Sequence, residues 1–174
     1  MRMKVDETGI TELVGLVDHV TGMNKVAFGF FLEDETDAKK PLLSYPSDDE
    51  IEAPVREMLA EVNEIESRRL GRPGVPKYWK LLARNRHYFE STWKKHILLL
   101  DGKGIDPMGK LAMGLGVSVT NGCRYFICYF SDALRTDGWD DSLILEVLGV
   151  VDHYNSFNTL ATAMQIESDI RPKH

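Results

Sequence analysis

Apolar residues at helical spacing constrain the fold of this chain more than any other feature of the sequence. After Ser47, charged residues separate apolar positions that recur every three or four residues. These positions are Ile51, Val55, Met58, Leu59, Val62 and Ile65. Side chains three and four residues apart share one face of an α-helix, so the spacing predicts an amphipathic helix. Because the sequence has no Gly-rich phosphate loop, internal repeat or strand–helix alternation, we expect an all-α multihelical bundle.

Cap and turn residues divide this helical region into six segments. Residues 47–50 have the spacing of a capping box, and Pro54 suits the first turn of the helix that follows. Turns, most of which contain glycine, separate the later helices, which we expect at residues 76–82, 87–100, 107–120, 123–134 and 142–166. The helix at 107–120 is rich in small residues, which would let neighbouring helices approach closely.

The segment at residues 142–166 is apolar nearly all round. Its apolar residues are Leu143, Ile144, Leu145, Val147, Leu148, Val150, Val151, Phe157 and Leu160. A helix without a broad polar face is buried in the middle of a bundle or between subunits. We therefore expect this helix to contribute to a closed homo-oligomer.

Residues 1–45 differ from the rest of the chain. Residues 10–20 predict a short helix that Gly22 ends, and residues 26–32 form a strand-like apolar run. The acidic residues 33–37 and Pro41 follow. We interpret residues 1–45 as an N-terminal arm or oligomerisation segment with a short strand, packed on the domain or on a second subunit. Residues 46–174 are then the helical domain.

Length and charge exclude several classes of protein. The chain has 174 residues, enough for one domain with an arm, and its net charge of −6 argues against a nucleic-acid partner. Arg68, Arg69 and Arg72 share a helix with many acidic residues, so we interpret them as a solvated helix end. The sequence has neither an apolar run of bilayer length nor a signal peptide, so we expect a cytoplasmic protein with no membrane partner. In that reducing setting the two cysteines would act as thiols.

Both cysteines lie in residues 120–130, TNGCRYFICYF, just after an Asn-Gly pair. A Trp- and Leu-rich helix pair, PKYWKLLARNRHYFESTWKKHILLL, and a helix running into Asn-Gly-Cys precede them. A glycine turn and an apolar helix containing NSFN follow. In this order the segments resemble the alkyl hydroperoxidase D (AhpD)-like, carboxymuconolactone decarboxylase-like family over residues 50–165. The resemblance implies an AhpD-like multihelical bundle.

The resemblance also implies where a redox site would lie. Redox members of that family form trimers or hexamers and carry a Cys-x-x-Cys pair on a helix. A histidine lies four residues past the second cysteine, and a glutamate lies twelve residues before the first. Cys123 matches the first cysteine, whereas Phe126, Phe130 and Leu111 stand at the positions of the second cysteine, the histidine and the glutamate. The peroxide-reducing site is therefore expected to be largely lost.

Two interpretations of function follow from this resemblance, and they leave open whether the protein is an enzyme. The first is a family member without standard peroxidase activity: a binding or assembly protein, or an enzyme that reuses the pocket for a small molecule. The second is an antioxidant, thiol-dependent peroxidase that acts through Cys123 alone. The decarboxylase branch of the family fits less well, because the matching stretch FSDALRTDG has no histidine.

The two cysteines themselves predict no disulfide. Cys128 lies five residues after Cys123, about 140° around an ideal helix, with a Cα separation of roughly 8–9 Å that exceeds the disulfide range. We expect Cys128 to be a buried small hydrophobe instead of a resolving thiol. Cys123 lies near a helix N-terminus, which favours the thiolate; the alternative is an inherited, half-buried thiol.

Glu146 and His153 are secondary candidates. They lie seven residues apart in the apolar helix and share a face, so they could form a buried proton relay or half of a metal site. The alternative is a hydrogen-bonded histidine in the core or at a subunit contact. No third ligand has suitable spacing, so we expect neither a metal nor a cofactor. His87 and His96 are interpreted as helix-surface residues. Tyr125, Tyr129 and Tyr154 could line a cavity for a small-molecule ligand or belong to the core.

Overall fold

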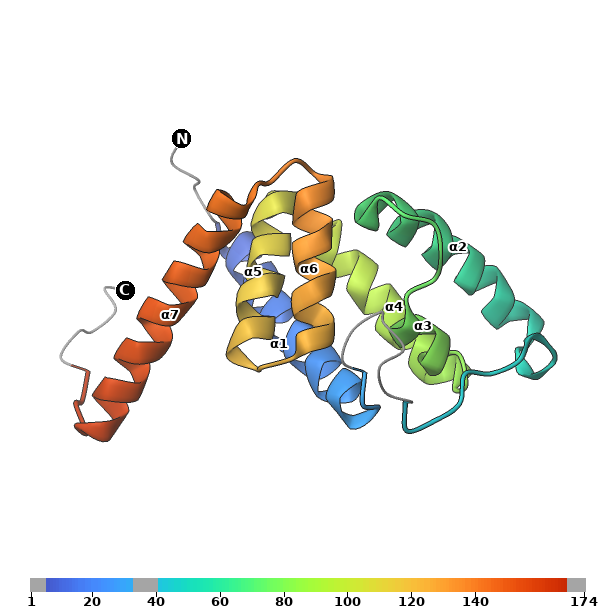
Figure 1. Ribbon diagram of the computed structural model, residues 1–174, viewed down its shortest axis with the longest axis horizontal. Helices are drawn as coiled ribbons and strands as arrows, with labels where there is room; N and C mark the ends of the chain where they lie inside the picture. Colours follow the sequence, from blue (N-terminus) through green and yellow to red (C-terminus); the bar gives the residue numbers. More distant parts are fainter. Residues whose placement is uncertain (1–5, 33–40, 169–174) are drawn as a thin grey trace.

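The computed structural model describes residues 6–32 and 41–168, which form helices joined by turns and contain no strand (Figure 1). The all-α class predicted from the sequence is confirmed. The elements are α1 (Glu7–Gly29), the 3₁₀ helix η1 (Asp48–Glu50), α2 (Ala53–Leu70), α3 (Lys77–Leu82), α4 (Arg86–Leu100), α5 (Pro107–Thr120), α6 (Arg124–Thr136) and α7 (Asp141–Ala163). Helices α2 to α7 lie close to their predicted bounds.

Four helices begin at a residue whose side chain accepts a hydrogen bond from a backbone N–H of the first turn. These N-caps are Asp6 of α1, Asn85 of α4, Asp106 of α5 and Asp140 of α7. Each cap satisfies a donor that the start of a helix leaves unpaired. The predicted capping box of Ser47 and Glu50 is present, but it closes η1, and α2 begins separately with a proline in its first turn.

Helix α1 runs without a break from Glu7 to Gly29, which corrects two predictions. Gly22 does not end the helix, and residues 26–32 are not a strand but the end of α1 and the turn after it. The buried face of α1 explains the difference, because it continues at helical spacing on both sides of Gly22. Its members are Leu16, Val20, Met23 and Ala27, each at most 2% exposed. A mid-helix glycine costs about 1 kcal/mol, and the burial of this face outweighs that cost.

Helix α1 is built into the same core as the rest of the chain, where it packs against α4, α5 and α6. The carboxylate of Glu12 accepts a hydrogen bond from Nζ of Lys110 at 2.9 Å, and the Lys110 side chain is fully buried. A Cβ atom at Gly102 would lie 1.5 Å from Oε1 of Glu12, so a side chain there would displace the carboxylate. We considered that this segment packs either on the domain or on a second subunit. Helix α1 packs on the domain of its own chain. The acidic residues 33–37 lie outside the described residues.

Helices α5 and α6 approach closely at a glycine. A Cβ atom at Gly114 would lie 2.4 Å from Cε1 of Phe130, so the missing side chain lets the phenyl ring rest on α5. This contact agrees with the role predicted for the small residues of this helix. Beside it, α3 and α4 meet around Trp79, whose ring contacts those of Tyr78 and Trp93 edge-on at 5.1 and 5.0 Å. The core of the bundle is therefore largely aromatic.

Helix α7 stands apart from this core and packs on α5 (Figure 1). Ile144 is the only residue of α7 that is buried. The large apolar residues of α7 that are exposed are Leu143, Leu145, Val150, Tyr154, Phe157 and Leu160. The prediction that this helix is buried in the middle of the bundle is therefore wrong for a single chain. It failed because α1, which we assigned to an arm, packs on α5 as part of the core. A place between subunits stays a prediction.

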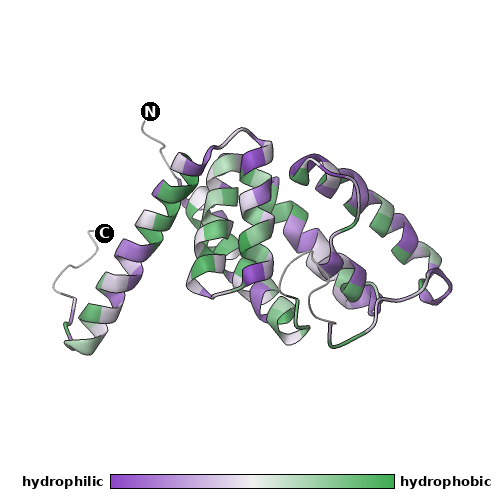
Figure 2. Ribbon diagram, viewed as in Figure 1, coloured by the Kyte–Doolittle hydropathy of each residue, from purple (hydrophilic) through white to green (hydrophobic). Residues whose placement is uncertain are grey.

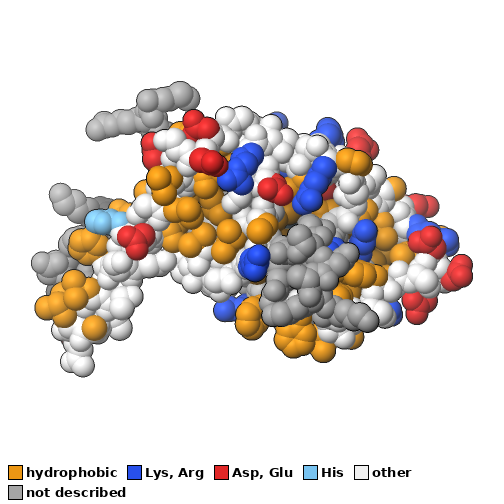
Figure 3. Space-filling view, in the orientation of Figure 1, with side chains coloured by type: hydrophobic (Ala, Val, Ile, Leu, Met, Phe, Trp, Pro, Cys, Tyr) orange, Lys and Arg blue, Asp and Glu red, His pale blue; other side chains and the backbone are white. Residues whose placement is uncertain are grey.

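The apolar residues of α7 are visible along the ribbon and on the molecular surface. Figure 2 shows hydrophobic positions from one end of α7 to the other. Figure 3 shows hydrophobic side chains on α7 and on the neighbouring face of the molecule. Even so, within residues 6–32 and 41–168 no helix combines the length and the apolar character needed to cross a bilayer.

Candidate functional site

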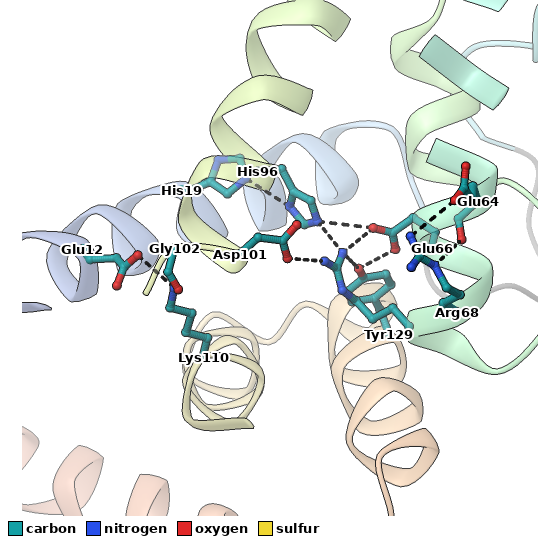
Figure 4. A network of polar contacts seen from close by, with 11 residues as sticks. Glu12, His19, Glu64, Glu66, Arg68, His96, Asp101, Gly102, Lys110 and Tyr129 are labelled. Carbon is teal, nitrogen blue, oxygen red and sulfur yellow. Dashed lines mark hydrogen bonds and ion pairs between the residues drawn. The ribbon is translucent and has the colours of Figure 1, made fainter. Parts of the chain in front are cut away.

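Five polar side chains from four helices meet inside the apolar core. They are His19 of α1, Glu66 and Arg69 of α2, His96 of α4 and Tyr129 of α6, and we call them the buried polar cluster (Figure 4). Glu66 is 0% exposed and His96 is 1% exposed. Glu66 continues the buried face of α2 that begins at Val55 and Val62. Helical spacing therefore carries a carboxylate into a position that would suit an apolar side chain.

Glu66 accepts the two shortest hydrogen bonds of the cluster. Its Oε2 accepts a hydrogen bond from the Tyr129 hydroxyl at 2.5 Å, and its Oε1 accepts one from Nη1 of Arg69 at 2.5 Å. Burial opposes the charged form of Glu66, but His96, Arg69 and Tyr129 outweigh it and lower the pKa of the carboxyl group. Burial raises the pKa of Tyr129 well above its ordinary value, so the phenol stays protonated and donates. The interior thus holds a carboxylate–guanidinium pair.

The two histidines extend the cluster toward α1. Nδ1 of His96 lies 3.3 Å from Nε2 of His19, and Nε2 of His96 lies 3.1 Å from Nη1 of Arg69. Burial lowers the pKa of both rings, that of His19 to about 3, so both are neutral at neutral pH. Nε2 of His96 also lies 3.5 Å from Oε1 of Glu66. This ring nitrogen therefore faces both a guanidinium, which only donates, and a carboxylate, which only accepts.

Arg69 connects the cluster to a surface cavity. The cavity measures about 350 Å³, and we call it the Arg69 cavity. Its walls are Ile65, Arg68, Arg69, Leu100, Asp101, Pro107, Met108, Leu111 and Asp137. Nη2 of Arg69 lies 3.5 Å from Oδ1 of Asp101, whose side chain is 56% exposed. Burial opposes the charge of Arg69, but Tyr129 and Glu66 raise the pKa of its guanidinium above the ordinary value. Arg69 therefore presents a permanent, largely buried positive charge at the cavity wall.

The cysteines lie on different sides of α6 and are not joined in a disulfide. Cys123 is the N-cap of α6 and is 3% exposed. Burial raises the pKa of its thiol, although the N–H groups of Phe126 and Tyr125 act in the opposite direction. We expected the helix N-terminus to favour the thiolate form of Cys123, but the burial of this side chain opposes that form. Cys128 is exposed, not buried as predicted, because the inward face of α6 is formed by other residues.

The three apolar residues at the positions of the implied redox site are buried. Leu111 is 4% exposed, Phe126 is 1% and Phe130 is 0%. The Phe126 ring lies 5.1 Å from that of Tyr78 and 6.1 Å from that of Phe130. Leu111 differs from the two phenylalanines because it also lines the Arg69 cavity. The implied glutamate position is therefore beside an open space and the two others are in packed core.

The secondary candidates on α7 are not brought together. Glu146 and His153 are both exposed, so the prediction of a buried pair is wrong for a single chain, whereas a subunit contact stays a prediction. The His153 ring instead contacts Tyr154 and Phe157, the latter with ring centroids 4.6 Å apart. In the part of the chain that the structure describes, no three His, Cys, Asp or Glu residues are grouped so that they could hold a metal ion.

Sequence reasoning missed most of the buried polar cluster. Arg69 was interpreted as part of a solvated helix end and His96 as a surface residue, although Tyr129 was recognised as a candidate for lining a cavity. The spacing of His96 indicates that it is buried, because it follows Phe89 by seven residues and Trp93 by three on the buried face of α4. A polar residue in register with a buried apolar face is the pattern that both Glu66 and His96 share.

No protein-family model matches the chain, and no curated protein or solved structure does so either.

Proposed function

We propose that this chain is an AhpD-like helical protein that binds a small organic acid in the Arg69 cavity and does not reduce peroxides through a dithiol. The observation that carries the proposal is the buried Glu66–Arg69 pair, which presents a guanidinium to a cavity of about 350 Å³. In the family that the sequence resembles, a glutamate would stand at Leu111, in the wall of this same cavity. The proposal is that the pocket is reused for a different chemistry.

The distribution of charge in the cavity favours an anionic ligand. The Arg69 side chain is only 11% exposed, whereas Asp101 is 56% exposed and Asp137 is also exposed. Among the residues that line the cavity, the most buried charge is therefore positive, and the lining carboxylates lie toward solvent. The contact between Nη2 of Arg69 and Asp101 is long, at 3.5 Å, so a ligand carboxylate could take the place of Asp101.

The remaining walls favour a hydrocarbon body on that ligand. Ile65, Leu100, Pro107, Met108 and Leu111 supply apolar surface around the guanidinium. Pockets for small molecules combine such walls with a few polar anchors. The ligand class is therefore a small carboxylic acid with an aliphatic or alicyclic body.

Titration of the full chain with cyclohexanecarboxylate tests this proposal by calorimetry. We expect saturable binding that Arg69→Lys weakens about tenfold, because lysine cannot reproduce the planar guanidinium contact. Asp101→Asn should tighten binding, since it removes the competing carboxylate at the surface. The matched control is Arg72→Lys, because Arg72 pairs with Asp132 and does not line the cavity. Absence of binding, or binding unchanged in both Arg69→Lys and Asp101→Asn, contradicts the proposal.

The alternative function, a peroxidase acting through Cys123 alone, has its own test. The burial of Cys123, which raises the pKa of its thiol, weighs against it. We expect hydroperoxide consumption with dithiothreitol as reductant to be the same in the parent, Cys123→Ser and Cys128→Ser proteins. Consumption that is lost in Cys123→Ser and kept in Cys128→Ser would establish the peroxidase instead.

The proposal includes a homo-oligomer, a trimer or hexamer, that forms in the cytoplasm through α7. The exposed residues Val150, Phe157 and Met164 follow one another at intervals of seven, and Leu160 lies beside them. A seven-residue apolar repeat lies along one face of a helix and suits a second helix packed alongside. A second copy of α7 is the partner that this spacing favours.

A further inference from the structure

A second cavity lies at the α1 end of the buried polar cluster. It measures about 290 Å³ and is bounded by α1, α3 and α4. The side chains that define it are His19, Tyr78, Tyr88, Thr92 and Lys95, and we call it the Tyr78 cavity. None of these residues lines the Arg69 cavity. His19 belongs both to this cavity and to the cluster, through its contact with His96.

The Tyr78 hydroxyl is a buried group without a partner. Tyr78 is 1% exposed, and its hydroxyl makes no hydrogen bond to the described residues. Its position is fixed by other contacts: its ring meets those of Trp79 and Phe126 edge-on at 5.1 Å, and its backbone N–H donates to the Tyr125 hydroxyl at 3.1 Å. Buried hydroxyl groups in proteins are normally paired. An unpaired one beside a cavity indicates a missing acceptor.

The inner end of the cavity offers no charge that would compensate a charged acceptor. Burial raises the pKa of Tyr78, with smaller contributions from Tyr88 and Cys123, so the phenol remains a neutral donor. Burial also lowers the pKa of His19 to about 3, so this ring is neutral as well. At the rim, Lys95 and Asp18 neutralise each other in an ion pair of 2.6 Å. An uncharged oxygen is therefore the acceptor that fits.

We propose that the Tyr78 cavity is a second binding site, for a small uncharged molecule whose hydroxyl or carbonyl oxygen accepts the hydrogen bond of Tyr78. The ring or chain of that molecule would fill the space between α1 and α4. This site is independent of the organic-acid site, because the two cavities share no wall residue. Either proposal can fail without the other.

Amide chemical shifts measured by NMR on the full chain, with cyclohexanol as probe, test the second site. We expect saturable shifts around residues 19–23, 78 and 88–95 and none around residues 100–111. Tyr78→Phe should weaken binding about fivefold, the usual effect of one hydrogen bond. It should leave the melting temperature unlowered, because the deleted hydroxyl has no protein partner. Tyr154→Phe, on the exposed face of α7, is the control.

A cavity-filling variant gives a second, steric test. Gly22 lines the cavity within α1, and a Cβ atom there meets no atom within 4 Å, so Gly22→Leu can enter the space without a clash. It should abolish cyclohexanol binding while the melting temperature rises or holds, because leucine is the better helix former. Gly29→Leu, equally unobstructed at the end of the same helix, should bind as the parent does.

Two outcomes overturn the proposal. One is the absence of saturable shifts with cyclohexanol, which would mean that water alone serves the Tyr78 hydroxyl. The other is binding that neither Tyr78→Phe nor Gly22→Leu changes. Parallel titrations with cyclohexanecarboxylate keep the two sites apart, since that probe should shift residues 100–111 instead.

Discussion

Helices α2 and α7 depart from the usual distribution of polar and apolar residues in opposite directions. Helix α2 is rich in charged residues, yet it carries Glu66 and Arg69 into the core. Helix α7 is apolar nearly all round, yet only Ile144 is buried. Composition alone would place α2 at the surface and α7 in the interior. The two exceptions lie where we propose binding: a ligand beside α2 and a second copy of the chain along α7.

The energetic costs of the two exceptions also differ. Burying a charge costs several kcal/mol unless its partners compensate, so each member of the α2 pair depends on the other. Exposing an apolar residue carries no such local penalty, because much of any protein surface is apolar. Substitutions in α2 should therefore affect the stability of one chain, and substitutions in α7 should affect the assembly of several.

The largest effect is expected from breaking the buried pair. Arg69→Ala leaves Glu66 charged and uncompensated, which should lower the free energy of unfolding by about 3–5 kcal/mol. The double variant Glu66→Leu/Arg69→Met should recover most of this loss, because no lone charge is left. Urea denaturation measures both. Arg72→Ala, which removes a half-exposed partner of Asp132, should cost less than 1 kcal/mol on the general scale for surface pairs. Equal losses in Arg69→Ala and Arg72→Ala would show that the pair is not buried.

The second effect concerns pH and the histidines of the buried cluster. A histidine whose pKa is lower in the folded state than in the unfolded state takes up its proton more readily when the chain is unfolded. The free energy of unfolding therefore falls as the pH drops below about 6.5, the pKa of an unfolded-state histidine. With the pKa of His19 at about 3, this residue alone should cost about 2 kcal/mol between pH 6.5 and pH 5. Glu66 acts at lower pH: its pKa is lowered, so its stabilising contribution is lost only as the carboxylate is protonated below about pH 4.5.

Urea midpoints between pH 7.5 and pH 5 separate these groups. His19→Leu should flatten the fall in stability. His96 adds to the slope in the same direction as His19, since burial lowers its pKa too. A parent protein whose stability is constant over this range would contradict the burial of both rings.

The sequence predicted where most helices begin and end better than it predicted which helices pack together. Local signals, such as Asp106 and Asp140 as caps, gave the bounds of α4 to α7 closely. The length of α1 was missed because Gly22 was given more weight than the apolar spacing that continues past it. Burial depends on which helices pack together, and this is not local: α7 was expected in the interior because it is apolar nearly all round, but α1 packs on α5 in the core. The cluster was missed for a similar reason, because Arg69 can be recognised as buried only once Glu66, His96 and Tyr129 are known to surround it.

The third prediction concerns the exposed apolar residues of α7. Light scattering of the full chain should give a closed homo-oligomer, and Val150→Lys/Phe157→Lys/Leu160→Lys should give monomers. The free energy of unfolding of the monomer should change by less than about 1 kcal/mol, because these side chains are exposed in a single chain. Leu98→Lys, at an exposed position on α4, is the control and should keep the oligomer. A monomeric parent at micromolar concentration would end the prediction.

Truncation, in contrast, cannot test the N-terminal segment as an assembly arm. A chain that begins at Ser44 lacks α1 and with it the buried residues Leu16, Val20, Met23 and Ala27. We expect such a chain to lose its near-ultraviolet circular dichroism signal, because the aromatic core would be opened. A folded, oligomeric truncated chain would instead show that α1 is dispensable.

The smallest effect is expected from the two cysteines, and it tests the orientation of α6 between the two exceptional helices. The orientation that turns Tyr129 toward Glu66 also turns Cys128 to solvent, and Cys123 is buried at the helix start. Ellman's reagent should therefore react quickly with one thiol of the native chain and, in Cys128→Ser, roughly tenfold or more slowly, since burial holds Cys123 protonated and shielded. Stability should be unchanged in Cys128→Ser. Should Cys123→Ser remove the fast thiol instead, α6 is rotated from this orientation, Tyr129 cannot reach Glu66, and the buried polar cluster loses one of its hydrogen bonds.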